Sequence, residues 1–446
     1  MSISGRTIAS LAADLASGAA TSRALVEAAL AAIATDGTAF THLNAARARG
    51  EADALDRLRQ EGRVLSPLHG VPVSVKDLFD IAGEATAAGS VLLREAVPAL
   101  RDAPPVARLR QAGAVIVGRT HMSEFAFSGL GANPHSPPCT NPHDRTRVPG
   151  GSSSGAAVSV AQGAVAVGLG TDTGGSTRIP AAFCGVVGFK PTQARVTREG
   201  AFPLSETLDS IGPLANSVAC CALVDGVIAD APVDAHPPLG VAGLRFGVPS
   251  ELVLDGMDAT VARAFERALK RLADAGAVVS RVSVPALARV PEINAKGGIV
   301  HAEAFAIHTR TGLFKQRERY DPNVAARIDI GARMTAADYI ELLRARAAVT
   351  AEVARISVGL DALVFPTTPT VAPRFDEIAE AASFGRLNAL ALRNPGLVNF
   401  LDRCALSLPM HAAGELPSGL MLVGEHMGDG RLFAVGAAVE RVVRLG

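Results

Sequence analysis

Two clusters of glycine and serine stand near the middle of the sequence. The first is GGSSSG at 150–155, and the second is TDTGGS at 171–176. Glycine lets the backbone approach a reacting group and turn its N–H groups toward that group. Gly174 and Gly175 directly precede Ser176, so this spacing would place backbone donors near the Ser176 hydroxyl, as an oxyanion hole requires. The pattern favours a site centred on a serine.

Other interpretations of the two clusters stay open at this point. The first cluster could be a flexible linker and the second a turn, although a linker is not usually followed at once by an Ala/Val-rich core. A phosphate-binding loop would need a lysine after Gly155, and none follows. The Gly-x-Ser-x-Gly pattern of other serine hydrolases is not present in the clusters either. A serine-centred site is therefore one interpretation among several.

A catalytic serine needs a base, and none of the ten histidines lies within 150–192. Lys76 is a different candidate, because it closes an alternating apolar strand at 70–76. A lysine in that position usually keeps its charge in water or pairs with a carboxylate, here Asp77 or Asp80. Alternatively, burial lowers its pKa far enough for it to serve as a base. That second role requires distance from uncompensated carboxylates.

Short apolar segments alternate with helical ones along the chain. The periodicity predicts helices over 22–33, 156–161 and 259–273, and strands over 70–76, 114–118, 164–169, 244–248, 363–365 and 419–423, with another strand opening at 278–279. A helix, a glycine and then a buried strand is the rhythm of a parallel sheet, in which the loops after the strands carry ligands. The proline-rich 230–240 reads as a linker or surface crossover. Because the same rhythm lies on both sides, one large sheet is preferred over two domains. The charged segment 302–349 is predicted to form a helical cap or flank.

Composition excludes several classes of protein. Lys+Arg and Asp+Glu are 43 each, so the net charge is zero, which argues against direct nucleic-acid binding and against attachment to an anionic membrane. No segment has the length and apolarity of a signal peptide or a membrane span. The five cysteines are scattered, and no metal-ligand spacing is visible. We therefore expect a cytoplasmic protein without a metal or a disulfide framework.

The clusters, the 24-residue interval from Ser152 to Ser176 and the upstream Lys76 together resemble the amidase signature family. Further segments fit the same family, among them GVPVSVKD at 70–77 and FCGVVGFKPT at 183–192. The resemblance covers nearly the whole chain. It is highly specific through 150–192 and loose between about 230 and 361.

The resemblance implies the family fold, a single α/β/α domain over residues 1–446 with a large, mixed, twisted sheet covered by helices on both faces. Its core signature segment would be 70–215, and its flanking helical cap would be about 290–350.

The resemblance also implies a Ser–cis-Ser–Lys triad, in which Ser176 is the nucleophile, Ser152 is the bridging serine after a cis peptide bond, and Lys76 is the base. Other residues of the two clusters would assist the triad. The backbone N–H groups of Thr173, Gly174 and Gly175 would bind the oxyanion. The side chains of Ser153, Asp172 and Arg178 would support the loops.

The implied reaction is hydrolysis of a carboxylic amide to a carboxylate and ammonia or an amine, through an acyl-enzyme on Ser176 and without metal or organic cofactor. The rival is the glutaminase (A) subunit of a tRNA-dependent amidotransferase, which works with partner subunits; Arg319-Tyr320-Asp321 resembles part of its pattern. A non-enzymatic relative is disfavoured because Lys76, Ser152 and Ser176 are all intact. The sequence names neither the amide nor the oligomeric state, and a homodimer stays open.

Overall fold

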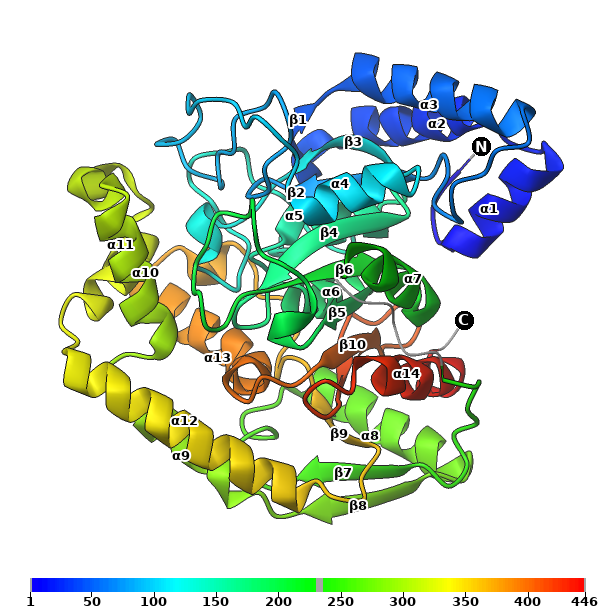
Figure 1. The fold of residues 1–446 in the computed structure, drawn as a ribbon. Coiled ribbons are helices and arrows are strands. Elements are labelled where there is room, and N and C mark those ends of the chain that lie inside the picture. The colour runs from blue at the N-terminus through cyan, green and yellow to red at the C-terminus, as the bar shows by residue number, and fades with distance from the viewer. Residues whose placement is uncertain (1, 230–235, 445–446) are drawn as a thin grey trace.

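The strands of the protein form one mixed sheet in the computed structural model, which describes residues 2–229 and 236–444 (Figure 1). In chain order the eleven strands are β1 (Phe40–Leu43), β2 (Pro72–Lys76), β3 (Val115–Thr120), β4 (Val167–Asp172), β5 (Val187–Lys190), β6 (Ser210–Ala215), β7 (Arg245–Pro249), β8 (Val278–Val282), β9 (Ala362–Pro366), β10 (Ala405–Pro409) and β11 (Gly419–Val423). Their order across the sheet is β1-β3-β2-β4-β6-β5-β10-β11-β9-β7-β8.

The sheet combines parallel and antiparallel pairs. β2 pairs in parallel with β3 and β4, and β7 pairs in parallel with β8 and β9. Antiparallel pairs join these two groups, from β4 through β6, β5, β10 and β11 to β9. Most of the strands are buried along their whole length, which explains why sequences such as those of β9 and β11 read as apolar runs without a solvent-facing alternation.

The helices between the strands have clear local causes. Thr21 caps α2 by accepting a hydrogen bond from the Ala24 N–H at 3.0 Å, and Asp258 caps α8 in the same way. The first nine α-helices of the described residues are α1 (Ile8–Ser17), α2 (Ser22–Thr35), α3 (Ala45–Gln60), α4 (Pro104–Gln111), α5 (Ser154–Ala161), α6 (Arg178–Cys184), α7 (Val218–Ile228), α8 (Ala259–Asp274) and α9 (Pro285–Ile293). The last two are α13 (Ala381–Phe400) and α14 (Asp429–Val443).

Helices cover the sheet on both faces. α4, α7, α14 and α8 contact one another in that order and form a row in front of the sheet in Figure 1. α5 and α6 pack together against β4 and β5. The chain moves in opposite directions along the sheet from β2 to β3 and from β3 to β4, so right-handed crossovers place α4 and α5 on opposite faces. The α/β fold with a large mixed sheet, predicted from the resemblance, is confirmed.

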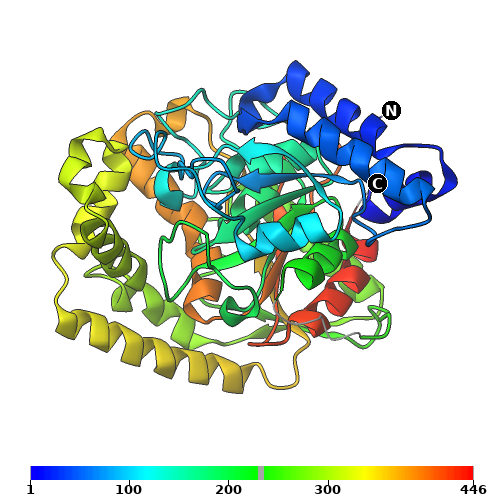
Figure 2. The ribbon, with the colours of Figure 1, turned by 45° about the horizontal axis from the view of Figure 1, so that its top comes forward.

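A group of helices, here called the cap, lies along one side of the molecule. It consists of α10 (Ile299–Arg310), the short η4 (Leu313–Arg319), α11 (Pro322–Gly331) and α12 (Ala336–Ile356). Figure 2 shows the cap on the opposite side of the molecule from the N-terminal helices. α12 packs against α9, and α10 packs against α11.

Two sequence predictions need adjustment. The strand predicted over 164–169 begins only at Val167, because the N–H groups of Ala164 and Val165 bond back to the Ser159 carbonyl as α5 ends. The predicted linker 230–240 lies partly outside the described residues, at 230–235. Because strands from both sides of that segment share one sheet, we propose that residues 1–446 form a single domain.

Candidate active site

Lys76 is the last residue of β2 and is completely buried. Its Nζ donates one hydrogen bond to Ser152 Oγ and one to Thr171 Oγ1, both at 2.7 Å. Asp77, the next residue, contacts Arg119 and the Gly89 N–H, so its carboxylate is engaged elsewhere. The lysine therefore contacts two hydroxyls, and the alternative prediction of an ion pair with Asp77 or Asp80 is wrong.

The first Gly/Ser cluster forms the turn that enters α5. The Gly151–Ser152 peptide bond is cis, as the resemblance implied, and Ser152 and Ser153 are fully buried. A Cβ on Gly151 would lie 2.7 Å from the Gly131 N atom, so glycine is required for this close approach. The Ser153 N–H donates to the Ser176 carbonyl at 3.2 Å, which places the two clusters side by side.

The second cluster begins in the last two residues of β4 and carries Ser176 to the edge of a cavity. Gly175 has φ of +128°, and a Cβ there would lie 2.5 Å from Pro395 Cβ, so a larger residue would not fit. Its N–H donates to Asp172 Oδ1 at 2.8 Å. Among the described residues, the N–H groups of Thr173, Gly174 and Ser176 have no hydrogen-bond acceptor, so they are available to a ligand.

Asp172 holds this loop in place. Its carboxylate accepts hydrogen bonds from Gly175 N–H, from Thr177 N–H and Oγ1, and from the Arg178 guanidinium, which forms a fully buried ion pair with it at 2.9 Å. Asn399 donates to the same carboxylate at 2.9 Å and accepts from Arg178 at 2.7 Å. Burial by itself would raise the pKa of Asp172, but the charges of Arg178 and Lys190 and the hydrogen bonds from Arg178 and Asn399 together hold that pKa below its usual range.

Burial also lowers the pKa of Lys76, to about 7. The charges of Asp209 and Asp172 oppose this shift, since a nearby anion favours the ammonium form. Both carboxylates have other partners, however. Asp172 is paired with Arg178, and Asp209 accepts from Thr173 Oγ1 at 2.5 Å and from two backbone N–H groups. Lys76 can therefore exist as a neutral amine near pH 7.

The sequence-predicted residues gather around one point, at the ends of β2 and β4 and the start of α5. Ser153 Oγ also takes part, since it donates to the Thr171 carbonyl at 3.2 Å. Two contributors were missed, Thr171 beside Lys76 and Asn399 beside Asp172. Thr171 belongs to the second Gly/Ser cluster, but its contact with Lys76 depends on the pairing register of β4 with β2, which no local pattern encodes.

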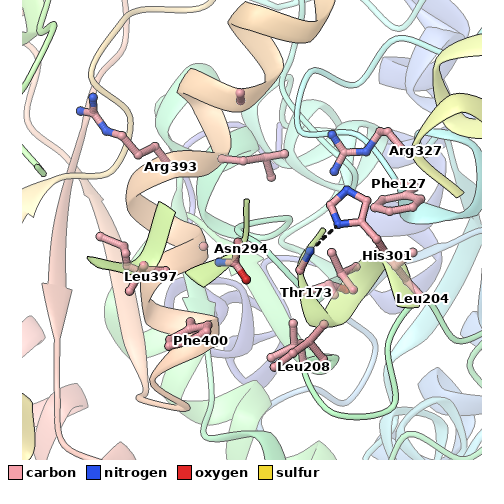
Figure 3. A pocket seen from close by; sticks show the side chains of 18 of the residues that line it. Phe127, Thr173, Leu204, Leu208, Asn294, His301, Arg327, Arg393, Leu397 and Phe400 are labelled. Carbon is pink, nitrogen blue, oxygen red and sulfur yellow. Dashed lines mark hydrogen bonds between the residues drawn. The ribbon is translucent and has the colours of Figure 1, made fainter. Parts of the chain in front are cut away.

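A cavity of about 380 Å³ lies beside Ser176, Thr173 and Gly174 (Figure 3). Its walls are mostly apolar side chains from distant segments, including Phe127, Leu204, Leu208, Ile299, Leu392, Leu397 and Phe400. The cap adds His301 and Arg327. An apolar pocket with a few placed polar groups is typical of a small-molecule site.

Other features of the described residues bear on the remaining predictions. All five cysteines are free and buried, and burial raises the pKa of the Cys184 thiol. Residues 2–229 and 236–444 contain no cluster of three or more His, Cys, Asp or Glu side chains arranged for a metal ion. In the same ranges no helix combines the length and the apolarity needed to cross a membrane.

Comparison with known proteins places these features in one family. The family model described as Amidase matches residues 24–433. A 2-amino-5-chloromuconic acid deaminase from Comamonas testosteroni is 38% identical over 416 residues, which cover 92% of this chain and 89% of that protein. The A subunit of a glutamyl-tRNA(Gln) amidotransferase from Anaeromyxobacter sp. (strain K) is 38% identical across 96% of this chain and 94% of that protein.

A solved structure gives the same result for the fold. A crystal structure of an amidase has 37% sequence identity to this chain and superposes with a TM-score of 0.89. The superposition covers 98% of this chain and 100% of the other.

Proposed function

The chain belongs to the amidase family, enzymes that hydrolyse amide carbon–nitrogen bonds, and from this membership we propose that it cleaves a carboxylic amide through an acyl-enzyme on Ser176. The observation that carries the proposal is the buried Lys76 Nζ, which lies 2.7 Å from Ser152 Oγ and has its pKa lowered to about 7. Ser153, the residue after Ser152, donates its N–H to the Ser176 carbonyl, so the loop that holds Ser152 contacts the Ser176 backbone. A neutral lysine at that position can accept a proton.

In the first half of the reaction, Ser176 Oγ attacks the amide carbonyl carbon while its proton passes to Ser152, whose own proton passes to Lys76. The Thr173, Gly174 and Ser176 N–H groups receive the oxyanion. The carbon–nitrogen bond then breaks, and the nitrogen leaves as ammonia or an amine after taking the proton back through Ser152. Because the Gly175 N–H is bonded to Asp172, we assign Gly175 to holding the loop, in place of the oxyanion role expected from the resemblance.

In the second half, a water molecule loses a proton along the same path and attacks the ester carbon of the acyl-enzyme. The bond to Ser176 Oγ breaks, Ser176 regains its proton, and the carboxylate is released. Each step combines attack by an oxygen nucleophile with proton transfers between named groups, so the mechanism needs no metal or organic cofactor. Ser153, Asp172 and Arg178 act by positioning the two loops.

The alternative is the glutaminase (A) subunit of a tRNA-dependent amidotransferase, which the 38% identity to such a protein supports. Glutamine carries an ammonium group in addition to its carboxylate. The described residues that line the cavity include no Asp or Glu to pair with that ammonium, and this favours an amidase that acts without partner subunits.

The test is release of ammonia or amine from a panel of carboxamides by the chain alone, with Ser176→Ala as the blank and with EDTA present in a parallel series. Turnover by the wild type, unchanged in EDTA and lost in Ser176→Ala, is the expected result. Hydrolysis of glutamine that begins only when partner subunits are added would favour the alternative.

A further inference from the structure

The cavity beside Ser176 contains a guanidinium that lacks a counter-ion. Arg327 projects from α11 of the cap, and within residues 2–229 and 236–444 it forms no ion pair and no side-chain hydrogen bond. Its Nε is buried without an acceptor. Its Cζ lies 4.4 Å from the centre of the Phe127 ring, a cation–π contact that fixes the plane of the guanidinium.

The other arginine that lines the cavity, by contrast, has acceptors for its hydrogen bonds. Arg393 donates to the Asp255 carbonyl at 2.7 Å and to Asn394 Oδ1 at 3.1 Å, and in Figure 3 it lies well away from Arg327 and His301. Burial lowers the pKa of Arg327 to about 10, so it still carries its charge at neutral pH. Arg327 is partly buried, and its Nε is shielded from water without an acceptor, which is unfavourable for a cation; a bound anion would remove that cost.

His301 adds a second donor beside Arg327. The Gly298 N–H donates to His301 Nδ1 at 3.1 Å, so in the neutral ring the proton resides on Nε2. Burial first, and then the Arg327 charge, lower the pKa of His301 to about 3, so the ring is neutral at working pH. Figure 3 shows the imidazole directly next to the Arg327 guanidinium, while its other nitrogen accepts the hydrogen bond from the Gly298 N–H. Two N–H donor groups, neither of which is bonded to an acceptor among the described residues, therefore meet at this end of the cavity.

We propose that the substrate is an amide with a free carboxylate, a monoamide of a dicarboxylic acid, whose carboxylate binds Arg327 and the His301 Nε2–H while its amide reaches Ser176. Arginine presents paired N–H groups that match a carboxylate. The apolar side chains between the two ends, such as Leu204 and Leu208, suit a short methylene chain. This inference rests on the proposed amide hydrolysis at Ser176.

The test compares monoamides from malonamate to adipamate with their methyl esters, which keep the amide and lose the charge. In the wild type we expect kcat/KM for the best acid to exceed that for its ester by at least about 30-fold, the lower range for truncating a buried charge pair. Arg327→Met should lose that advantage, mostly through KM, and should change the rate on the ester by much less. Arg333→Met, an exposed arginine six residues further along, is the matched control and should behave as wild type.

A binding measurement keeps the proposal testable if a variant is inactive or unstable. The dicarboxylate product should raise the melting temperature of Ser176→Ala and fail to do so in Ser176→Ala combined with Arg327→Met. Arg327→Lys keeps the charge without the paired geometry, and should retain part of the preference.

The outcomes separate this inference from the function on which it rests. Equal rates on acids and esters, unaffected by Arg327→Met, would overturn the carboxylate site and leave the amidase function intact. If no amide of either set is hydrolysed, the amidase proposal fails, and the melting shift still decides whether Arg327 binds a carboxylate. A preference confined to N-acyl amino acids, with the carboxylate in the leaving amine, would overturn the monoamide assignment.

Discussion

Lys76 and Lys190 are both buried at the ends of strands in the same sheet, but the atoms that receive their hydrogen bonds differ. Lys76 ends β2 and donates to the hydroxyls of Ser152 and Thr171. Lys190 ends β5 and donates to the carbonyls of Pro191 at 2.7 Å and Arg403 at 3.0 Å. Burial is the main cause that lowers the pKa of each lysine.

Burial alone therefore does not make a lysine a catalytic base. A hydroxyl can donate as well as accept, so Ser152 can pass a proton to a neutral Lys76. A carbonyl can only accept, so the partners of Lys190 hold it as a donor and have no proton to give. Lys190 therefore ties β5 to the loop before β10, whereas Lys76 is placed for catalysis. The following predictions test this contrast.

The largest effect is expected at Ser176, where the proton path from Lys76 ends. Ser176→Ala should lower kcat by at least about 10,000-fold, because the hydroxyl that forms the covalent bond is gone. Ammonia release and mass spectrometry after fluorophosphonate treatment measure the loss of turnover and of labelling. A thermal unfolding curve like that of the wild type is the control. Undiminished labelling of the variant would mean that the nucleophile is another residue.

A loss of about 100-fold or more is expected when Lys76 cannot release its proton. Lys76→Arg should be nearly as inactive as Lys76→Ala, because a guanidinium stays protonated at working pH. Steady-state kcat/KM on one carboxamide compares the two variants. If Lys76→Arg retains more than about a tenth of wild-type activity, well above that expected loss, Lys76 is a structural charge like Lys190.

The resemblance of the Gly/Ser clusters and Lys76 to the amidase signature family predicted the family and the large mixed sheet, whereas the periodicity alone indicated a parallel sheet. The sequence does not separate Lys76 from Lys190, since both follow apolar strand residues and their partners come from distant parts of the chain. Thr171 and Arg327 were missed for the same reason. Strand register and cap packing bring them to the site, and neither is encoded in a local pattern.

The pH profile should show the titration of Lys76. With a pKa of about 7 and a neutral active form, kcat/KM should fall about tenfold for each pH unit below 7 and level off above it. Because of the same lowered pKa, the folded state binds fewer protons than the unfolded state between about pH 7 and 10.5. The buried charge of Lys76 therefore destabilises the fold below pH 7. This destabilisation decreases as the pH rises from 7 to 10.5. A profile that is flat from pH 5.5 to 8 would contradict the assignment.

A smaller effect, about tenfold in kcat/KM, is expected from Thr171→Val, which removes one hydrogen bond from Lys76 and keeps the side-chain shape. The acidic limb of the pH profile should also move to lower pH, because the Thr171 oxygen favours the ammonium form. Ser74→Ala is the matched control, since the Ser74 hydroxyl lies on β2, the strand of Lys76, and contacts Ser159 in place of the lysine. An unmoved limb in Thr171→Val would show that this contact does not tune Lys76.

The smallest effect on activity is expected from Lys190→Met, which keeps the apolar stem of the buried lysine and removes the ammonium group. We expect kcat/KM to change by less than about fivefold, equivalent to roughly 1 kcal/mol in the barrier. The free energy of unfolding should instead fall by about 1–3 kcal/mol, because the buried carbonyls of Pro191 and Arg403 lose their donor. Urea unfolding and steady-state kinetics on the same preparation measure both quantities.

Lys76→Met should show the opposite balance, with activity lost and the fold retained, because its hydroxyl partners can rotate toward other acceptors. A Lys190→Met enzyme that folds normally and loses 100-fold in rate would mean that carbonyl partners do not exclude a buried lysine from the reaction.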